Sequence, residues 1–197
     1  MSDYTNRTKR EEEMKLVILA ALLANRPEGD VMTEAELSSL QSQLSSDLVA
    51  PIDGIIDDTI KQLIDDYQLT ATAEEIKAKL DFSAADKASE LAQQITDHTR
   101  EALAGQELTD DVLESIMGDI RANVIAVTET TAINCAVVVA AATALGSPDL
   151  DPTTLVWRTS EDDAVCEECE PKDGQPIADV DIPPEHPNCR CWIEQAS

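Results

Sequence analysis

Residues 109–152, TDDVLESIMGDIRANVIAVTETTAINCAVVVAAATALGSPDLDP, contain the longest helix-forming run of the chain and the point at which it ends. Thr109 is a good helix cap, and no proline interrupts the run from 110 to 145. Gly118 is expected to break or kink the helix, and the Gly-Ser-Pro sequence at 146–148 is expected to stop it. The stretch therefore predicts helix over about 110–145 and a different structure after it.

The chain before this run also has a helical pattern. Leucines recur at helical spacing, and Thr33 with Glu36 and Thr72 with Glu75 have the spacing of capping boxes. Further signals delimit the next helix, which Ser83 would cap and Gly105 would end. We predict helices over 9–25, over the segment that carries Leu37, Leu40, Leu44 and Leu48 and that Pro51 would close, and over 52–67, 73–80 and 84–104.

The composition supports helix-on-helix packing. The chain of 197 residues has one Phe, two Trp and two Tyr, so its core must consist mostly of Ala, Ile, Leu and Val. We predict a mainly α fold with an elongated helical region over 1–117. The second part, 118–197, would contain the long helix to about 145 and a small cysteine-rich module, α+β or irregular with short strands, over 153–197.

The charge balance narrows the classes of function. The chain carries 40 acidic and 14 basic residues, a net charge of −26. Such a surface repels phosphate, and non-specific nucleic-acid binding depends on Lys and Arg. The composition therefore argues against a general nucleic-acid-binding protein. It is typical of proteins that attract cationic partners and also of proteins adapted to high salt, and both interpretations stay open.

No stretch of the sequence indicates a membrane segment or a signal peptide. The longest apolar runs, 16–24 and 136–145, are shorter than the ~20 residues that cross a bilayer. The N-terminus is polar and lacks an apolar core. We expect the protein to fold in a reducing cytoplasm, where cysteines are thiols or metal ligands rather than disulfides.

The cysteine-rich module has too little apolar sequence to fold by burial alone. TLVWRT at 154–159 and CRCWI at 189–193 look like short strands, and a turn signal stands at Asp173 and Gly174. Prolines between them exclude long helices. Because a module of ~45 residues usually needs a metal or disulfide staple, the cysteines are expected to supply one.

Five residues have the spacing of a zinc site. A Cys-x2-Cys pair, Cys166 and Cys169, is followed after residues 170–185 by the sequence His-x2-Cys-x-Cys, which contains His186, Cys189 and Cys191. Zinc takes four N or S ligands in a tetrahedron, and Cys189 and Cys191 would point to the same side of an extended segment. The sequence does not decide which of His186, Cys189 and Cys191 is left out of the four ligand positions. Two disulfides, or buried thiols without metal, are the alternatives.

A catalytic centre is the weaker interpretation of the same residues. The sequence HPN at 186–188 is similar to part of a His-Asn-His nuclease, which needs a further histidine as general base. His98 is the only other histidine, and we predict it to be an exposed residue on a polar helix. Cys135 is predicted to be a helix-core residue. We therefore expect no enzymatic activity and no catalytic or organic-cofactor site.

The C-terminal part resembles the phage head morphogenesis proteins, the minor head proteins similar to protein F of phage Mu. The resemblance covers about 118–194. Val127 and Ala164 stand where the family often has Arg, so two positive charges are lost. The positions that carry the resemblance are Arg121, Thr128, Glu129, Asn134, Trp157, Thr159, Asp162, Val165, Cys166, Cys169, Asp173, Gly174, Pro183, Pro184, His186, Pro187, Asn188, Cys189, Arg190 and Cys191.

The resemblance implies a low-copy virion component of a tailed phage. Such proteins associate with the portal, enter the procapsid in the host cytoplasm, and are linked to DNA packaging or ejection. The partners implied are the portal protein and the major capsid or scaffold proteins, with the helical region docking at the portal. Direct DNA contact and self-association are left open, as are two alternatives: a metal-dependent nuclease and a zinc-containing host adaptor.

Overall fold

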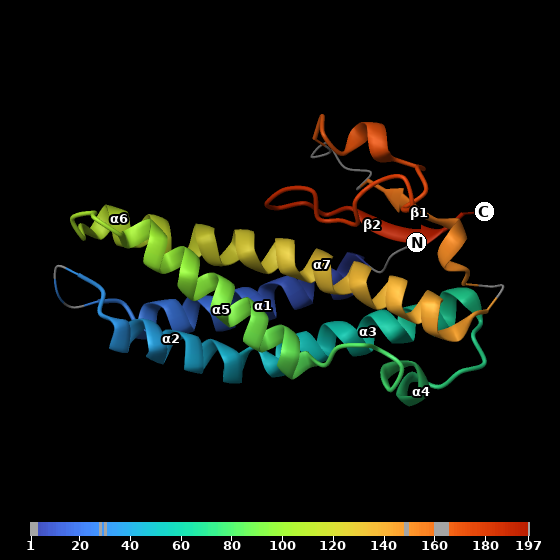
Figure 1. Ribbon diagram of the computed structural model, residues 1–197, viewed down its shortest axis with the longest axis horizontal. Coiled ribbons are helices and arrows are strands. Elements are labelled where there is room, and N and C mark those ends of the chain that lie inside the picture. The colour runs from blue at the N-terminus through green and yellow to red at the C-terminus, as the bar shows by residue number, and fades with distance from the viewer. Residues whose placement is uncertain (1–3, 28, 30, 148–149, 160–165, 197) are drawn as a thin grey trace. The chain divides into compact units, whose positions relative to one another are not determined.

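The computed structural model describes residues 4–196 except 28, 30, 148–149 and 160–165. It confirms the mainly α fold class (Figure 1). A two-stranded sheet lies at the C-terminal end of the chain. The elements are α1 Tyr4–Ala24, α2 Glu34–Asp47, α3 Val49–Tyr67, α4 Ala73–Lys77, α5 Ala84–Leu103, α6 Asp110–Met117, α7 Asp119–Leu145, β1 Leu155–Arg158 and β2 Trp192–Gln195, with 3₁₀ turns at Pro152–Thr154 and Glu170–Lys172.

The chain forms two compact units, each assembled from separated segments. The first, which we call the cysteine unit, takes its described residues from Met1–Arg7, Gly54–Asp81 and Val127–Ser197. The second, the helical unit, consists of Thr8–Asp53 and Phe82–Ala126. The domain boundary that we place near residue 117 from the sequence stays a prediction.

Three helices begin at the capping boxes that the sequence contains. The Thr33 hydroxyl accepts a hydrogen bond from Glu36 N at 3.2 Å, and the Glu36 carboxylate accepts one from Thr33 N at 2.7 Å. Thr72 and Glu75 repeat the arrangement at α4. At α5, Ser83 forms its box with Asp86. The predicted starts are therefore confirmed, and each cap contributes about 1 kcal/mol by satisfying backbone N–H groups.

Pro51 does not end a helix, contrary to the sequence-based prediction. α2 ends at Asp47, and α3 already begins at Val49, so Pro51 lies in the first turn of α3. A first-turn position has no intrahelical acceptor for its N–H, so proline costs nothing there. The leucine pattern that continues through Leu48 hides the break between the two helices.

Gly118 interrupts the long helical run as expected. α6 ends at Met117, α7 begins at Asp119, and Gly118 is the C-cap between them. A Cβ atom on this glycine would lie 2.2 Å from the carbonyl oxygen of Glu114. The close approach of that carbonyl, rather than an unusual φ, therefore requires glycine here.

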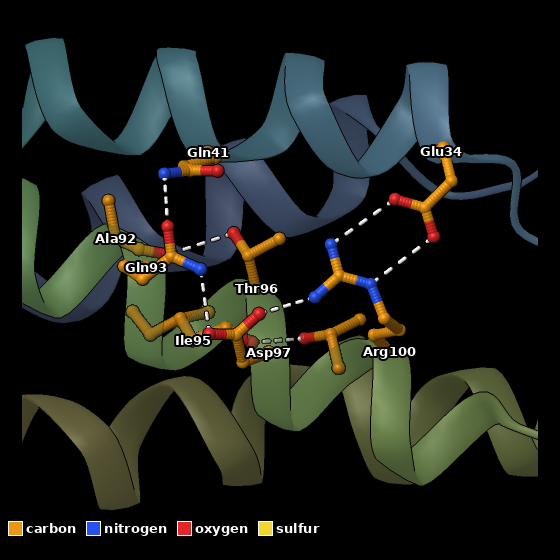
Figure 2. A network of polar contacts seen from close by, with 9 residues as sticks. Glu34, Gln41, Ala92, Gln93, Ile95, Thr96, Asp97 and Arg100 are labelled. Atoms are coloured by element: carbon orange, nitrogen blue, oxygen red, sulfur yellow. Dashed lines mark hydrogen bonds and ion pairs between the residues drawn. The ribbon is translucent and has the colours of Figure 1, made fainter.

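In the helical unit, α2 packs against α5 through leucines, alanines and isoleucines. A polar network extends along the outside of this contact (Figure 2). Gln41 donates to Gln93 at 2.6 Å, and Gln93 donates to Asp97 at 2.6 Å. Arg100 pairs with Asp97 on its own helix and with Glu34 on α2 at 3.3 Å. Each of these exposed bonds contributes little, and the buried residues supply most of the energy of the contact.

In the cysteine unit, β1 and β2 pair antiparallel, with Trp157 opposite Ile193. The other edge of β1 binds the turn after Asp173, because Trp157 N donates to Gln175 O at 2.9 Å and Gly174 N donates to Trp157 O at 2.8 Å. The predicted strand at 154–159 is thus confirmed. The second predicted strand is wrong in its start, since β2 begins only at Trp192 and leaves both preceding cysteines outside it.

One helical stretch, Asp110–Leu145, is long and apolar enough to cross a membrane by length and composition alone. Half of its most apolar window is buried within the protein, and core helices pass the same test. The stretch is also interrupted by the break at Gly118. It is therefore weak evidence for a membrane segment.

Candidate metal centre

The structure brings all five predicted ligands together in two overlapping groups. Cys166, Cys169 and His186 have their ligand atoms within 4.8 Å of one another, and so do Cys169, Cys189 and Cys191. Cys169 belongs to both groups. Each of these cysteines is a free thiol, so the disulfide alternative is not the state that the structure shows.

The Cys166–Cys169 pair lies on a tight turn. Cys169 N donates to Cys166 O at 3.1 Å and also to the Cys166 sulfur at 3.3 Å. Glu170 N donates to the same carbonyl at 3.0 Å. A turn of this kind directs both sulfurs to one side, and backbone N–H groups that point at a ligand sulfur stabilise its thiolate form.

In the second half of the cluster, His186 and Cys189 also lie on a turn, and Cys191 follows it just before β2. Cys189 N donates to His186 O at 3.1 Å. Asn188 makes the turn possible with a φ of 64°, a left-handed conformation that asparagine tolerates better than most residues. Neither cysteine lies in β2, but both side chains are buried at the cluster, so the expectation that they point to the same side is confirmed.

His186 presents its Nε2 to the thiols. Nε2 lies 2.9 Å from the Cys166 sulfur and 3.3 Å from the Cys169 sulfur. Its Nδ1 lies 2.8 Å from Pro187 O, and a carbonyl only accepts, so Nδ1 carries the proton. In this tautomer the Nε2 lone pair faces the sulfurs, which is the orientation that metal-binding histidines take.

The thiols of the cluster have unequal proton affinities. A hydrogen bond from the Cys191 thiol lowers the pKa of Cys189 to about 5, and the same contact raises that of Cys191. Burial raises the pKa of Cys169 to about 12. At Cys166 burial acts to raise the pKa, but the N–H donors of the turn outweigh it and the pKa is lowered. The hydrogen bond to Pro187 O raises the pKa of His186.

Trp157 forms the apolar wall of the cluster. It is fully buried and packs with Cys169, Cys189 and Cys191. Lys172, which pairs with Glu185, places its ammonium 5.0 Å from the ring centroid, within the range of a cation–π contact. The tryptophan of β1 thus shields the buried sulfurs from water.

Helix α7 and the start of α1 hold the backbone of the second turn. Asn188 N donates to the Thr128 hydroxyl at 3.0 Å, and the Thr131 hydroxyl lies 2.6 Å from the Cys189 carbonyl oxygen. Arg7 donates to Arg190 O at 2.9 Å and to Thr131 Oγ1 at 2.5 Å. Sequence reasoning singled out Thr128 but missed Thr131 and Arg7; the spacing of Thr131, three residues after Thr128, was the available signal.

The donor set fits a tetrahedral metal. Zn–S and Zn–N bonds place two bound sulfurs about 3.8 Å apart and a sulfur and a nitrogen about 3.6 Å apart. The Cys169 and Cys189 sulfurs lie 3.9 Å apart, and the Cys169 sulfur lies 3.3 Å from His186 Nε2. The residues could therefore hold a metal after small side-chain adjustments, and which of them bind one stays a prediction.

The two candidates outside the cluster have the roles that the sequence predicts. Cys135 is buried in α7, and burial raises its pKa to about 12. His98 is exposed on α5. Neither belongs to the metal-ligand groups found among the described residues.

Comparison with protein families gives a match over residues 82–194, from just before α5 to β2, with phage Mu protein F like proteins. This match covers more than half of the chain. The chain belongs to the phage Mu protein F like family. The resemblance found in the sequence is thereby confirmed, and it extends further upstream than 118. Searches among curated proteins and solved structures gave no match.

The matched region of this Mu F-like chain contains all five candidate ligands and, except for Arg7, the residues described above that hold the second turn. Thr128 binds the second turn, and Asn134 accepts a hydrogen bond from Thr59 at 2.5 Å. Asp173 accepts one from Thr159 N at 3.0 Å, and Gly174 has a φ of 74°. Asp162, Ala164 and Val165 lie outside the described residues. Family membership indicates a phage head morphogenesis protein that works with other head proteins in the virion.

Proposed function

We propose that this Mu F-like chain is a minor head protein that associates with the portal during procapsid assembly. The observation that carries the proposal is the family match over 82–194, which includes the cysteine module and the helices before it. The proposed partners of the chain are the portal protein and the major capsid or scaffold proteins. The helical region supplies the docking surface, and assembly takes place in the host cytoplasm.

Charge supports a protein partner over DNA. The net charge of −26 means that the chain repels the phosphates of a nucleic acid. Val127, at a position where the family often has Arg, is buried in α7. The chain then acts in DNA packaging or ejection by binding other head proteins, and not by binding DNA phosphates itself.

The chemistry of the cluster supports a structural role. Three or four thiolates around one metal are typical of closed sites that staple a fold, whereas hydrolytic sites keep an open position for water. A His-Asn-His nuclease needs a second histidine. The only one in the sequence is His98, an exposed residue of the helical unit. The sequence HPN at 186–188 therefore lacks the second histidine beside it that the nuclease alternative requires.

Mass spectrometry of purified virions and procapsids tests the proposal. We expect the chain in both particles at low copy, and we expect it to co-purify with the portal protein when the two are expressed together. An unrelated acidic phage protein expressed with the portal is the control for non-specific binding. Absence of the chain from particles, or equal recovery of the control with the portal, would contradict the proposal.

A further inference from the structure

The two halves of the cysteine cluster have the same local construction. In each, a residue and the third residue after it are closed by a backbone hydrogen bond of 3.1 Å, Cys169 N to Cys166 O and Cys189 N to His186 O. The first residue of each turn is partly exposed, and the second is buried. Two matched turns that face each other are the usual way in which a short chain presents four ligands to one zinc ion.

Three distances between the turns are close to those of a shared centre, and Cys169 is the residue common to both ligand groups. His186 Nε2 lies 2.9 Å and 3.3 Å from the two sulfurs of the first turn. The sulfur of Cys189 lies 3.9 Å from that of Cys169, close to the ~3.8 Å edge of a zinc–sulfur tetrahedron. Each residue of the second turn therefore already approaches the first turn.

Cys191 lies outside both turns, unlike the other four candidate ligands. It follows the second turn and directly precedes β2, whose pairing with β1 fixes the backbone there. The backbone of Cys189, in contrast, is held inside the turn by His186 on one side and by Thr131 on the other. Cys191 still lies within 4.8 Å of the Cys169 and Cys189 sulfurs, close enough for its thiol to donate to a ligand sulfur.

We propose that the cluster is a closed zinc site with Cys166, Cys169, His186 Nε2 and Cys189 as ligands, and that Cys191 remains a thiol outside the coordination sphere. Three thiolates and one imidazole in a tetrahedron suit zinc better than Mg²⁺ or Ca²⁺, which prefer oxygen. The assignment rests on the geometry of the cluster alone, and it holds whether or not the protein docks at a portal.

Cobalt substitution of the full-length chain under reducing conditions tests the ligand set. The sulfur-to-cobalt charge-transfer absorption grows with each bound thiolate, and the visible bands report tetrahedral geometry. We expect one Co²⁺ per chain, displaced by one Zn²⁺, with an intensity typical of three thiolates. Cys191→Ser should keep this spectrum with at most about a 10–100-fold loss of affinity, the range for a residue that contacts a ligand.

Cys189→Ser should instead lose one third of the charge-transfer intensity or lose the metal. Circular dichroism of each variant shows whether the helices persist, and Cys135→Ser, which alters the buried thiol of α7 outside the metal-ligand groups, is the matched control. The reverse pattern, with Cys189→Ser unchanged and Cys191→Ser impaired, overturns the assignment. A four-thiolate spectrum, equal losses in the two variants, or no bound metal in the unaltered protein would overturn it as well.

Discussion

At the scale of single residues, the hydroxyl of Thr131 links three parts of the cysteine unit. It contacts the Cys189 carbonyl, accepts from Arg7, and lies fully buried. A threonine on a helix can satisfy its hydroxyl locally, as Thr143 does with Val139 O. Thr131 also approaches its own helix at Val127 O, so the same side chain both closes a helical turn and anchors the turn of His186 and Cys189.

Thr131→Val should destabilise the protein by about 1–3 kcal/mol, because the isosteric side chain leaves a buried carbonyl and the Arg7 guanidinium without this partner. Urea unfolding followed by circular dichroism gives the change in the unfolding midpoint. Thr143→Val is the matched control, an exposed threonine of the same helix, and it should change stability by less than about 0.5 kcal/mol. Equal effects of the two substitutions would show that the anchor contributes nothing.

A second prediction concerns Gly118. Gly118→Ala should destabilise the protein by about 1–3 kcal/mol, because the new Cβ would lie 2.2 Å from the Glu114 carbonyl oxygen and the backbone must shift. The same unfolding experiment measures the effect. Gly29→Ala, where no atom lies within 4 Å of the added Cβ, should be nearly neutral or slightly stabilising. A stabilised Gly118→Ala variant would contradict the close approach.

At the scale of elements, local signals predicted helices well and short strands poorly. Capping boxes fix a helix start within a few residues, so α2, α4 and α5 begin where the sequence indicates. β2 was placed too early because the alternation Cys-Arg-Cys-Trp-Ile has the period of a strand. A hydrogen bond to His186 and the positive φ of Asn188 override that period, and neither is encoded in the spacing of apolar residues.

The capping carboxylates should make helix stability depend on pH. Hydrogen bonds from the backbone and hydroxyl of Thr33 lower the pKa of Glu36, and those of Thr72 do the same for Glu75. The folded state therefore binds fewer protons than the unfolded state in this range, so the contribution is present above the ordinary glutamate pKa of 4.5 and is lost as pH falls below it.

Unfolding midpoints measured from pH 6 to about pH 3 test this dependence. Glu36→Gln should flatten the acid-side slope, because the amide keeps a hydrogen bond but does not titrate. Glu107→Gln, an exposed residue between α5 and α6, is the control and should leave the slope close to that of the unaltered protein. An unchanged slope in Glu36→Gln would show that the cap does not couple to protonation.

At the scale of the whole molecule, segments far apart in the sequence meet in the cysteine unit, where Arg7 binds the carbonyl of Arg190, 183 positions away. Tyr67 accepts from Gln195 N at 3.0 Å in the same unit. Sequence patterns report neighbours within a few turns, so they identified the candidate ligands and the helices but could not show that the compact units combine separated segments. The family resemblance linked motifs that lie far apart in the sequence to one kind of protein, which local patterns could not do.

Metal removal should therefore disturb the cysteine unit while leaving most helices intact. Free energy of metal binding to a site that the unfolded chain lacks becomes folding free energy, about 10–16 kcal/mol for small zinc modules. Chelation should loosen both turns and admit water to Trp157, which is fully buried against the sulfurs. The α2–α5 pair rests on its own apolar contacts and caps, so far-ultraviolet circular dichroism should change little.

Tryptophan fluorescence in a Trp192→Phe background isolates this signal, because Trp157 is then the only tryptophan. We expect its emission to shift to longer wavelength when a zinc chelator is added under reducing conditions, and to return when zinc is restored. Cys166→Ser should show the shifted emission without chelator, whereas Cys135→Ser should behave as the parent does. If the emission stays unchanged in a protein that has verifiably lost its metal, packing alone holds Trp157 and the metal does not staple the module. If the helical signal is lost together with the change in emission, the helices depend on the metal centre for their stability.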